Sequence, residues 1–278
     1  MTETSERTAA RMVNLERYPI DDPASEDCAE LVRACRDRFV EDGLCMLPQF
    51  IRPGALEALA GEANERTGDA WFCGSTHNVY LTENGGSPGI AGVPAGDVDG
   101  RQERTFVGSI PYDRIGNGSS LRHLYLWDPL KDFVGAVLGK ARLHRFADPL
   151  GACSVNVFVD GGEHGWHFDE SEFTVTLMLQ APESGGTFEY VPDIRGREDE
   201  RAIVATVLDG DRERVLELPF TVGTLLVFGG RRTLHRVTRV SGDRPRLVPV
   251  LTYAERPGLR NSEAVRKLFW GRTGTEPD

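Results

Sequence analysis

The chain has 278 residues, of which 40% are hydrophobic, and a formal net charge of -11. This length and composition allow one sizeable hydrophobic core. The acidic balance disfavours nucleic acid or an anionic membrane as the main partner, because both attract basic surfaces. We therefore expect a small-molecule substrate, and the composition leaves the oligomeric state open.

The five cysteines are scattered along the chain, and no Cys-X-X-Cys pair is present. Neither a disulfide framework nor a zinc ribbon is therefore predicted. No apolar stretch is long enough for the core of a signal peptide or for a membrane span. These features together predict a cytoplasmic protein.

The first part of the chain predicts a helical segment. Residues 1–24 are polar and are expected to form a flexible arm, and residues 25–278 a single domain. Apolar residues recur at helical spacing from Glu26 to Asp42, and Gly43 ends that pattern. A short strand over 44–50 and helices over 55–66 and 129–138 are also predicted, with a surface helix inside 193–214.

Residues 69–118 are rich in Gly, Asn and Pro, which predicts loops and short strands that cover a site. After this region short strand-like segments dominate, at 154–159, 173–180, 187–191, 215–218, 224–228 and 246–253. Many short strands separated by Gly and Pro turns favour a sandwich or jelly roll. The predicted fold class is mainly β with flanking helices.

The pattern His167-X-Asp169, followed much later by His235, is the strongest chemical feature. Residues two apart on a strand point to the same side, so His167 and Asp169 can reach one metal ion while Phe168 faces apolar packing. Two imidazoles and one carboxylate can occupy one face of an octahedral Fe(II) and leave three positions for other ligands. The pattern therefore indicates oxygen chemistry.

Each of these residues also has a plain structural interpretation. A lone histidine is more often a satisfied polar residue than a ligand, and His77, His123 and His144 are expected to be structural. His164 and His167 form His-X-X-His, which alone would suggest zinc. The distant His235 and the arginines beyond it favour iron, because a bound dicarboxylate needs a guanidinium.

Four segments together resemble the Fe(II)/2-oxoglutarate-dependent dioxygenase superfamily. They read GWHFD at 165–169, FTVTLMLQ at 173–180, GGTFEYVP at 185–192, and HRVT followed by GDRPRL between 235 and 247. More narrowly, they are similar to the branch that contains the free amino acid halogenases and their hydroxylase relatives. The resemblance runs from about residue 145 to residue 272.

This resemblance implies a double-stranded β-helix of the jelly-roll or cupin-like kind, with Fe(II) held by His167, Asp169 and His235. It also implies 2-oxoglutarate and dioxygen as cosubstrates. The far carboxylate of 2-oxoglutarate is expected to meet Arg246, with Arg244 as the competing candidate. Asn156 is expected to contact the same cosubstrate, although an Asn in a strand can equally cap a bulge.

The halogenases of this branch carry a small residue at the position of Asp169, and that vacancy admits a halide to the iron. The Asp in this chain therefore predicts hydroxylation of a C–H bond in a free amino acid. Substrate contacts are expected from the following residues: Arg104, Asp148, His164, Glu170, Thr252 and Trp270. For Asp148 the plain alternative is a turn residue, for Arg104 a solvated side chain, and for Trp270 ordinary packing.

Two kinds of alternative stay open on the sequence. The same oxidative chemistry can desaturate, cyclise or epimerise a substrate, or can act on an amino acid attached to a carrier protein or a peptide. In a different class, the site is a non-catalytic metal-binding β-barrel module, because a fold does not guarantee turnover. The arginines after His235 favour the enzyme.

Overall fold

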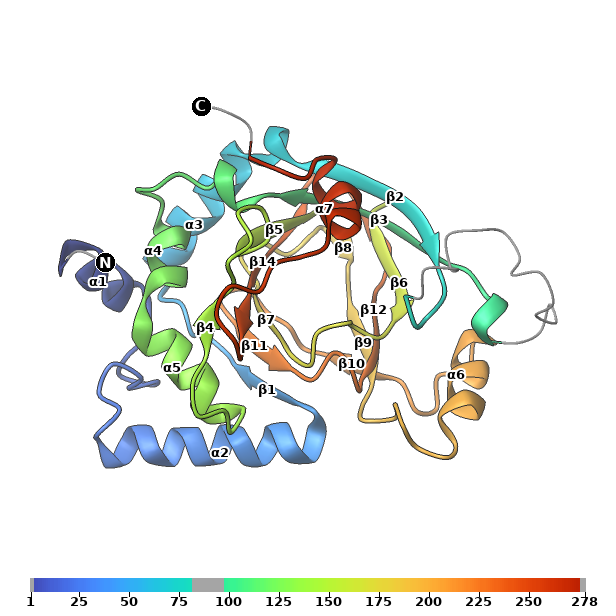
Figure 1. Ribbon diagram of the computed structural model, residues 1–278, viewed down its shortest axis with the longest axis horizontal. Helices are drawn as coiled ribbons and strands as arrows, with labels where there is room; N and C mark the ends of the chain where they lie inside the picture. Colours follow the sequence, from blue (N-terminus) through green and yellow to red (C-terminus); the bar gives the residue numbers. More distant parts are fainter. Residues whose placement is uncertain (1–2, 82–97, 276–278) are drawn as a thin grey trace.

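A single antiparallel sheet of eleven strands forms the centre of the computed structural model, which describes residues 3–81 and 98–275 (Figure 1). Its strand order is β1-β11-β7-β14-β5-β3-β6-β12-β9-β10, and β2 pairs with β3. Two small sheets, β13-β8 and β15-β4, complete the strands. The large sheet curls around a central space, as expected for a double-stranded β-helix.

The strands are β1 (Leu44–Leu47), β2 (Trp71–His77), β3 (Glu103–Ile110), β4 (His144–Arg145), β5 (Cys153–Phe158), β6 (Glu163–His167), β7 (Thr174–Leu177), β8 (Ser184–Gly185), β9 (Phe188–Val191), β10 (Leu216–Leu218), β11 (Leu225–Phe228), β12 (Leu234–Val237), β13 (Val240–Ser241), β14 (Arg246–Leu251) and β15 (Tyr253–Ala254). The helices are α1 (Glu3–Met12), α2 (Glu26–Asp42), α3 (Pro53–Glu65), α4 (Ser120–Leu126), α5 (Asp128–Val137), α6 (Glu200–Leu208) and α7 (Glu263–Trp270), with 3-10 turns η1 (Thr67–Asp69), η3 (Val98–Gly100) and η4 (Tyr112–Arg114).

The two faces of the sheet have different chemistry because side chains alternate along each strand. On β5, Val155 and Val157 join the large hydrophobic core, whereas Phe158 belongs to a second apolar cluster. On β14, Leu247 lies opposite Val157 in the same core, and Arg246 lies opposite Phe158. The sheet therefore turns one face to its covering helices and the other, which carries polar and charged groups, to the interior.

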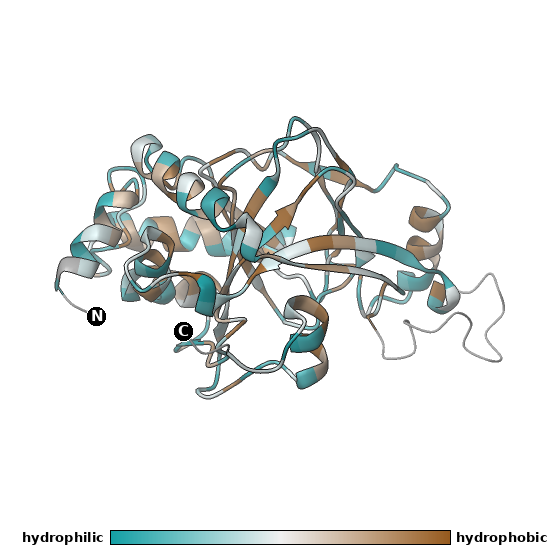
Figure 2. Ribbon diagram, turned by 90° about the horizontal axis from the view of Figure 1, so that it is seen from above, coloured by the Kyte–Doolittle hydropathy of each residue, from teal (hydrophilic) through white to brown (hydrophobic). Residues whose placement is uncertain are grey.

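The helices cover the sheet from several directions. Helices α1 to α5 gather on one side of it, α6 lies on the opposite side, and α7 packs against β2 and β3 (Figures 1 and 2). In Figure 2 the central strands are largely hydrophobic, whereas the helices mix hydrophobic and hydrophilic residues. Among the described helices, none combines the length and the apolar character needed to cross a lipid bilayer.

The N-terminal residues differ from the predicted flexible arm. Residues 3–12 form α1, and Ala9, Met12, Val13 and Ile20 are almost fully buried. Helix α1 packs against α4 and α3, and Val13 forms a β-bridge with Ile51. The few apolar side chains of this polar segment are ordered because distant helices supply a surface on which they can pack.

Part of the segment 69–118, where loops and short strands were predicted, lies outside the described residues, at 82–97. The described part contains β2 and β3, of seven and eight residues, and β3 lies inside the large sheet between β5 and β6. Thr105 and Ser109 are buried polar residues on β3. Their presence on an interior face hides the hydrophobic alternation by which a strand is recognised.

The predicted helices over 26–42, 55–66 and 129–138 are confirmed to within two residues at each end by α2, α3 and α5. Gly43 ends α2 with a φ of 74°.

Candidate metal centre

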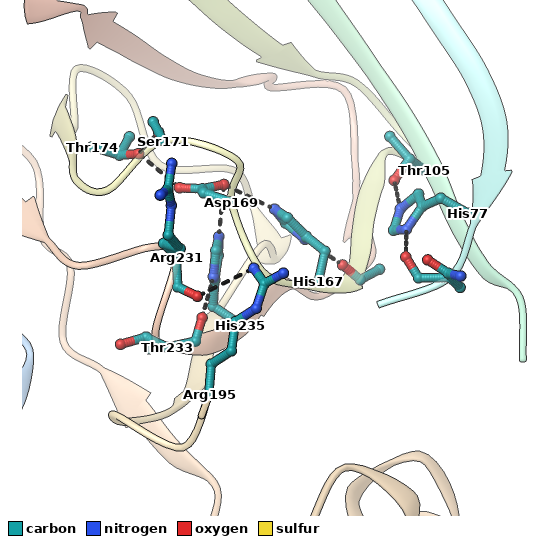
Figure 3. A network of polar contacts seen from close by, with 12 residues as sticks. His77, Thr105, His167, Asp169, Ser171, Thr174, Arg195, Arg231, Thr233 and His235 are labelled. Atoms are coloured by element: carbon teal, nitrogen blue, oxygen red, sulfur yellow. Dashed lines mark hydrogen bonds and ion pairs between the residues drawn. The ribbon is translucent and has the colours of Figure 1, made fainter. Parts of the chain in front are cut away.

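Three side chains from two separated segments converge inside the sheet (Figure 3). His167 ends β6 and His235 lies on β12, directly opposite each other in the strand register. The Asp169 Oδ1 atom lies 3.5 Å from Nε2 of His167 and 3.5 Å from Nε2 of His235. One ligand atom from each residue lies within 4.8 Å of the other two. The set matches the two imidazoles and one carboxylate of a non-heme iron site.

The main chain fixes the orientation of both imidazoles. Nδ1 of His167 lies 2.7 Å from the carbonyl oxygen of Gly165, and Nδ1 of His235 lies 2.9 Å from that of Thr233. A carbonyl can only accept, so in each ring Nδ1 carries the proton and donates it. Each Nε2 is then left with a free lone pair directed at the other members of the triad.

Burial and mutual contact set the charges of the triad. Burial, reinforced by the neighbouring His235, lowers the pKa of His167 to about 4. Burial alone would raise the pKa of Asp169, but His235 and His167 outweigh it and hold that pKa well below its usual range. A neutral His167 and an ionised Asp169 are the protonation states in which these residues bind a divalent metal.

The sequence predicted that Asp169 lies on the same strand as His167. In the structure, β6 ends at His167, and Asp169 lies just beyond that end. Its main-chain N–H donates to the carbonyl oxygen of Gly230 at 3.0 Å, and its Oδ2 accepts from the Thr174 hydroxyl at 2.7 Å. A Cβ atom on Gly230 would lie 2.0 Å from Oδ2, so a larger residue there would have to displace the carboxylate. Phe168 points away into an apolar cluster, as predicted.

Arg246 provides a buried positive charge on the inner face of β14. Its side chain is nearly inaccessible, at 2% exposure, and Nε has no hydrogen-bond partner within the described residues. The guanidinium lies 5.2 Å from the Phe158 ring and 5.9 Å from the Phe220 ring. Burial lowers its pKa to about 9. Arg244, in contrast, is exposed and donates to the carbonyl oxygen of Pro182 at 3.2 Å.

Residues 101–268 match the model of a protein family described as Halogenase D. The chain belongs to the Halogenase D family. The matched segment contains the triad and both arginines. A comparison with curated proteins yields no match.

Solved structures share the fold of this Halogenase D family member. The non-heme alpha-ketoglutarate-dependent epimerase SnoN of nogalamycin biosynthesis aligns with a TM-score of 0.56 and 14% identity, over 81% of this chain and 83% of SnoN. AviO1 from Streptomyces viridochromogenes Tue57 aligns with a TM-score of 0.54 and 17% identity, over 82% and 96%. The carbocyclase SnoK aligns with a TM-score of 0.54 and 15% identity, over 80% and 83%.

The predicted fold and enzyme class are confirmed: the protein is a double-stranded β-helix and a 2-oxoglutarate-dependent oxygenase. The predicted cofactors, Fe(II) with 2-oxoglutarate and dioxygen, agree with the donor set of the triad. The buried guanidinium of Arg246 fits a dicarboxylate, because its Nε has no hydrogen-bond partner among the described residues. The alternative of a non-catalytic metal-binding module is therefore set aside.

Two of the predicted substrate contacts are engaged within the protein instead. Arg104 is half-exposed and forms an ion pair with Glu163, on the opposite face of β3 from Thr105. Asp148 is buried and accepts from the backbone N–H groups of Leu150, Gly151 and Asn261. These contacts favour the plain interpretations, a solvated arginine and a turn residue.

The remaining candidates lie in different surroundings. The Glu170 side chain is exposed, and the main-chain oxygen of Thr252 accepts from the Tyr125 hydroxyl. Trp270 is packed, and its Nε1 donates to the Ser109 hydroxyl at 3.0 Å. The registered pairs of β3, β5 and β14 place Ser109 opposite Asn156, and Asn156 opposite Val248. Asn156 and Trp270 therefore approach the inner face that carries Arg246.

His164 is in direct contact with the triad. Its ring stacks on that of His167 with centroids 3.8 Å apart. In a regular strand, residues three apart point to opposite faces. The register of β6 against β12 shifts by one residue between His235 and Val237, which places His164 and His167 on the same side.

Sequence reasoning missed two residues of the site. His77, expected to be structural, lies edge-on to both His164 and His167, and its Nε2 is 2.7 Å from the Thr105 hydroxyl. Thr174 holds Asp169, as described above. The sequence contained a signal for Thr174 alone, because it lies on a predicted strand close to the His-X-Asp motif.

The close approach of Gly230 to Asp169 gives a first prediction. Replacing Gly230 with Ala is expected to displace the Asp169 carboxylate and to weaken Fe(II) binding by about tenfold or more, in the range seen when groups supporting metal ligands are removed. Isothermal titration of the metal-free protein under anaerobic conditions measures this. Gly229→Ala is the matched control, since its Cβ would meet only ordinary contacts of 3.5 Å or longer. Equal metal affinity of the two variants would contradict the expectation.

The lowered pKa of His167 predicts a pH-dependent stability of the metal-free protein. The unfolded chain binds a proton at His167 near pH 6.5, whereas the folded state resists it until about pH 4. Stability from this group is therefore complete above pH 6.5 and falls by about 2 kcal/mol between pH 7 and pH 5. Urea unfolding in EDTA at both pH values measures the loss. The unfolding free energy of His167→Gln should fall by about 2 kcal/mol less than that of the parent between pH 7 and pH 5. An equal fall in the two proteins would show that His167 does not cause the pH dependence.

Proposed function

We propose that this protein is an Fe(II)/2-oxoglutarate-dependent hydroxylase that acts on a C–H bond of a small polar molecule, most simply a free amino acid. The single observation that supports hydroxylation is the presence of Asp169 as the third member of the triad. The family takes its name from a halogenase. In the halogenases that this chain resembles, a small residue at this position leaves room for a halide.

The carboxylate of Asp169 is built firmly into the protein. Its main chain is held by Gly230, its Oδ2 by Thr174, and its Oδ1 faces the two imidazoles. An ionised carboxylate at this point supplies negative charge to a bound cation and occupies the space that a halide would need. These contacts favour hydroxyl transfer over halogen transfer.

Arg246 is the proposed anchor for the far carboxylate of 2-oxoglutarate. A guanidinium forms paired, charge-assisted hydrogen bonds with a carboxylate, and its charge here has no counterion among the described residues. The exposed Arg244 has no comparable need for a partner. Asn156 lies two residues before Phe158, the registered partner of Arg246, on the same face, and is proposed as a further contact.

When bound, Fe(II) would supply the activation of dioxygen that is coupled to decarboxylation of 2-oxoglutarate. His167, Asp169 and His235 would hold the metal, with the two imidazoles neutral and the carboxylate ionised. Phe158 and Phe220 exclude water from the guanidinium of Arg246, which strengthens its attraction to a dicarboxylate.

Neutral polar side chains on the inner face support a small polar substrate. Ser109, Ser154 and Thr176 are buried, and registered pairs connect them across β3, β5, β14 and β7. Their hydroxyls can donate to and accept from a substrate. The choice of a free amino acid rests on the resemblance to the amino acid enzymes, with His164 as the predicted contact nearest to the triad.

Product analysis tests the proposed reaction. Enzyme supplied with Fe(II), 2-oxoglutarate and dioxygen should decarboxylate 2-oxoglutarate faster with its proper substrate among the proteinogenic amino acids. Mass spectrometry should then show a product heavier by one oxygen atom, with or without chloride in the buffer. A chlorinated main product would refute hydroxylation, and loss of two hydrogen atoms or an unchanged mass with inverted stereochemistry would indicate desaturation, cyclisation or epimerisation.

The assignment of Arg246 predicts a specific loss of cosubstrate affinity. Arg246→Gln should raise the KM for 2-oxoglutarate by about 10- to 100-fold, which corresponds to one charged hydrogen-bonded pair of roughly 1.5–3 kcal/mol. Because the variant removes an unpaired buried charge, the ligand-free protein should keep or raise its Tm. Arg244→Gln is the matched control and should leave the KM unchanged. A larger increase in this KM for Arg244→Gln than for Arg246→Gln would assign the carboxylate contact to Arg244 instead.

A further inference from the structure

We propose that Thr174 is a positioning residue that binds one oxygen of Asp169 and so makes this carboxylate a one-oxygen ligand. The inference rests on the proposed metal centre. The Thr174 Oγ1 atom lies 2.7 Å from Asp169 Oδ2, whereas Oδ1 is the oxygen that lies 3.5 Å from both imidazoles (Figure 3). The two oxygens of this carboxylate therefore have separate partners.

The sheet, and not a loop, fixes the position of this donor. Thr174 is the first residue of β7 and is registered with Phe228 on β11. The Phe228 ring in turn packs edge-on against the imidazole of His235, with centroids 5.0 Å apart. The same strand pair thus positions the residue that holds the carboxylate and a ring that supports the distal imidazole.

The direction of the hydrogen bonds follows from the charge of Asp169. An ionised carboxylate can only accept, so the Thr174 hydroxyl must donate its single proton to Oδ2. The Ser171 hydroxyl lies 3.4 Å from Thr174 Oγ1, and since the Thr174 proton is already engaged, Ser171 is the donor in that contact. The result is a short directed chain from Ser171 through Thr174 to Asp169.

This arrangement has a consequence for the number of coordination positions. A carboxylate that binds through both oxygens occupies two positions on a metal ion, whereas one that binds through a single oxygen occupies one. Two imidazoles and a one-oxygen carboxylate leave three positions on an octahedral ion, of which a chelating 2-oxo acid needs two. By engaging Oδ2, Thr174 keeps the second oxygen from competing with the cosubstrate.

Metal binding to the metal-free protein tests the inference without turnover. Co(II) titration against a competing chelator, followed by visible absorption, should show about tenfold or greater weakening for Thr174→Val, which keeps the shape of the side chain but lacks the donor. Thr174→Ser keeps the donor and should bind Co(II) like the parent protein. Thr206→Val is the matched control, because it removes a threonine hydroxyl on α6 that donates to the Ile203 carbonyl oxygen and has no role in the proposed site. It should also bind normally.

A second measurement separates positioning from simple loss of a contact. In the Fe(II)-loaded protein without dioxygen, 2-oxoglutarate binding is followed by its metal-to-ligand absorption band, and Thr174→Val should raise the Kd whereas Thr206→Val should not. Thr174→Ala replaces Thr174→Val if that variant does not fold. Co(II) and 2-oxoglutarate affinities of the donor-free variant within about twofold of the parent overturn the role of Thr174. Failure of the parent itself to bind Co(II) would overturn the metal centre.

Discussion

The opposition of His167 and His235 on adjacent antiparallel strands is the constraint on which the rest of the site depends. Their registered positions hold the two rings 4.2 Å apart at their centroids, and backbone carbonyls fix which nitrogen of each ring is free. The carboxylate joins them only because the chain turns at the end of β6 and meets Gly230. Strand pairing thus fixes the relative positions of the two imidazoles, and the turn after β6 supplies the third ligand.

The register shift between β6 and β12 gives this pair of strands a second function. It turns His164 to the interior, where it stacks on His167, while His77 approaches from β2. Four imidazoles consequently lie close together in a space largely closed to water. Burial and the repulsion of neighbouring imidazoles both lower the pKa of His164 and the pKa of His167. The surroundings thus keep His167 in the neutral form that binds metals.

The sequence allowed prediction where local chemistry and strand periodicity agree. His167, Asp169 and His235 were found from residue type and spacing, and the structure brings them together. Residue parity could not separate Arg244 from Arg246, because the two positions have the same parity. Their different burial arises from the fold, in which Arg246 is the first residue of β14 and Arg244 lies in the bend before it. The stacking of His164 on His167 depends on a register shift that has no signature in the sequence.

Other parts of the fold were not predictable because their order depends on distant partners. Helix α1 packs through a few apolar side chains onto α3 and onto α4, which begins more than a hundred residues later. Strand β3 carries Thr105 and Ser109 inward, so its pattern resembles that of a loop. Arg104 and Asp148 were expected to contact the substrate because of the resemblance to the amino acid enzymes. In the structure, Arg104 forms an ion pair with Glu163, and Asp148 accepts from three backbone N–H groups.

As the proposed anchor of 2-oxoglutarate, the buried guanidinium of Arg246 would also link the supply of cosubstrate to the stability of the protein. Within the described residues its Nε has no hydrogen-bond partner, and a buried cation in that state destabilises the ligand-free fold; a carboxylate that pairs with it would remove that penalty. The saturated enzyme would then be more resistant to unfolding and proteolysis than the empty one. In a cell, abundance of the 2-oxo acid would prolong the lifetime of the enzyme that consumes it.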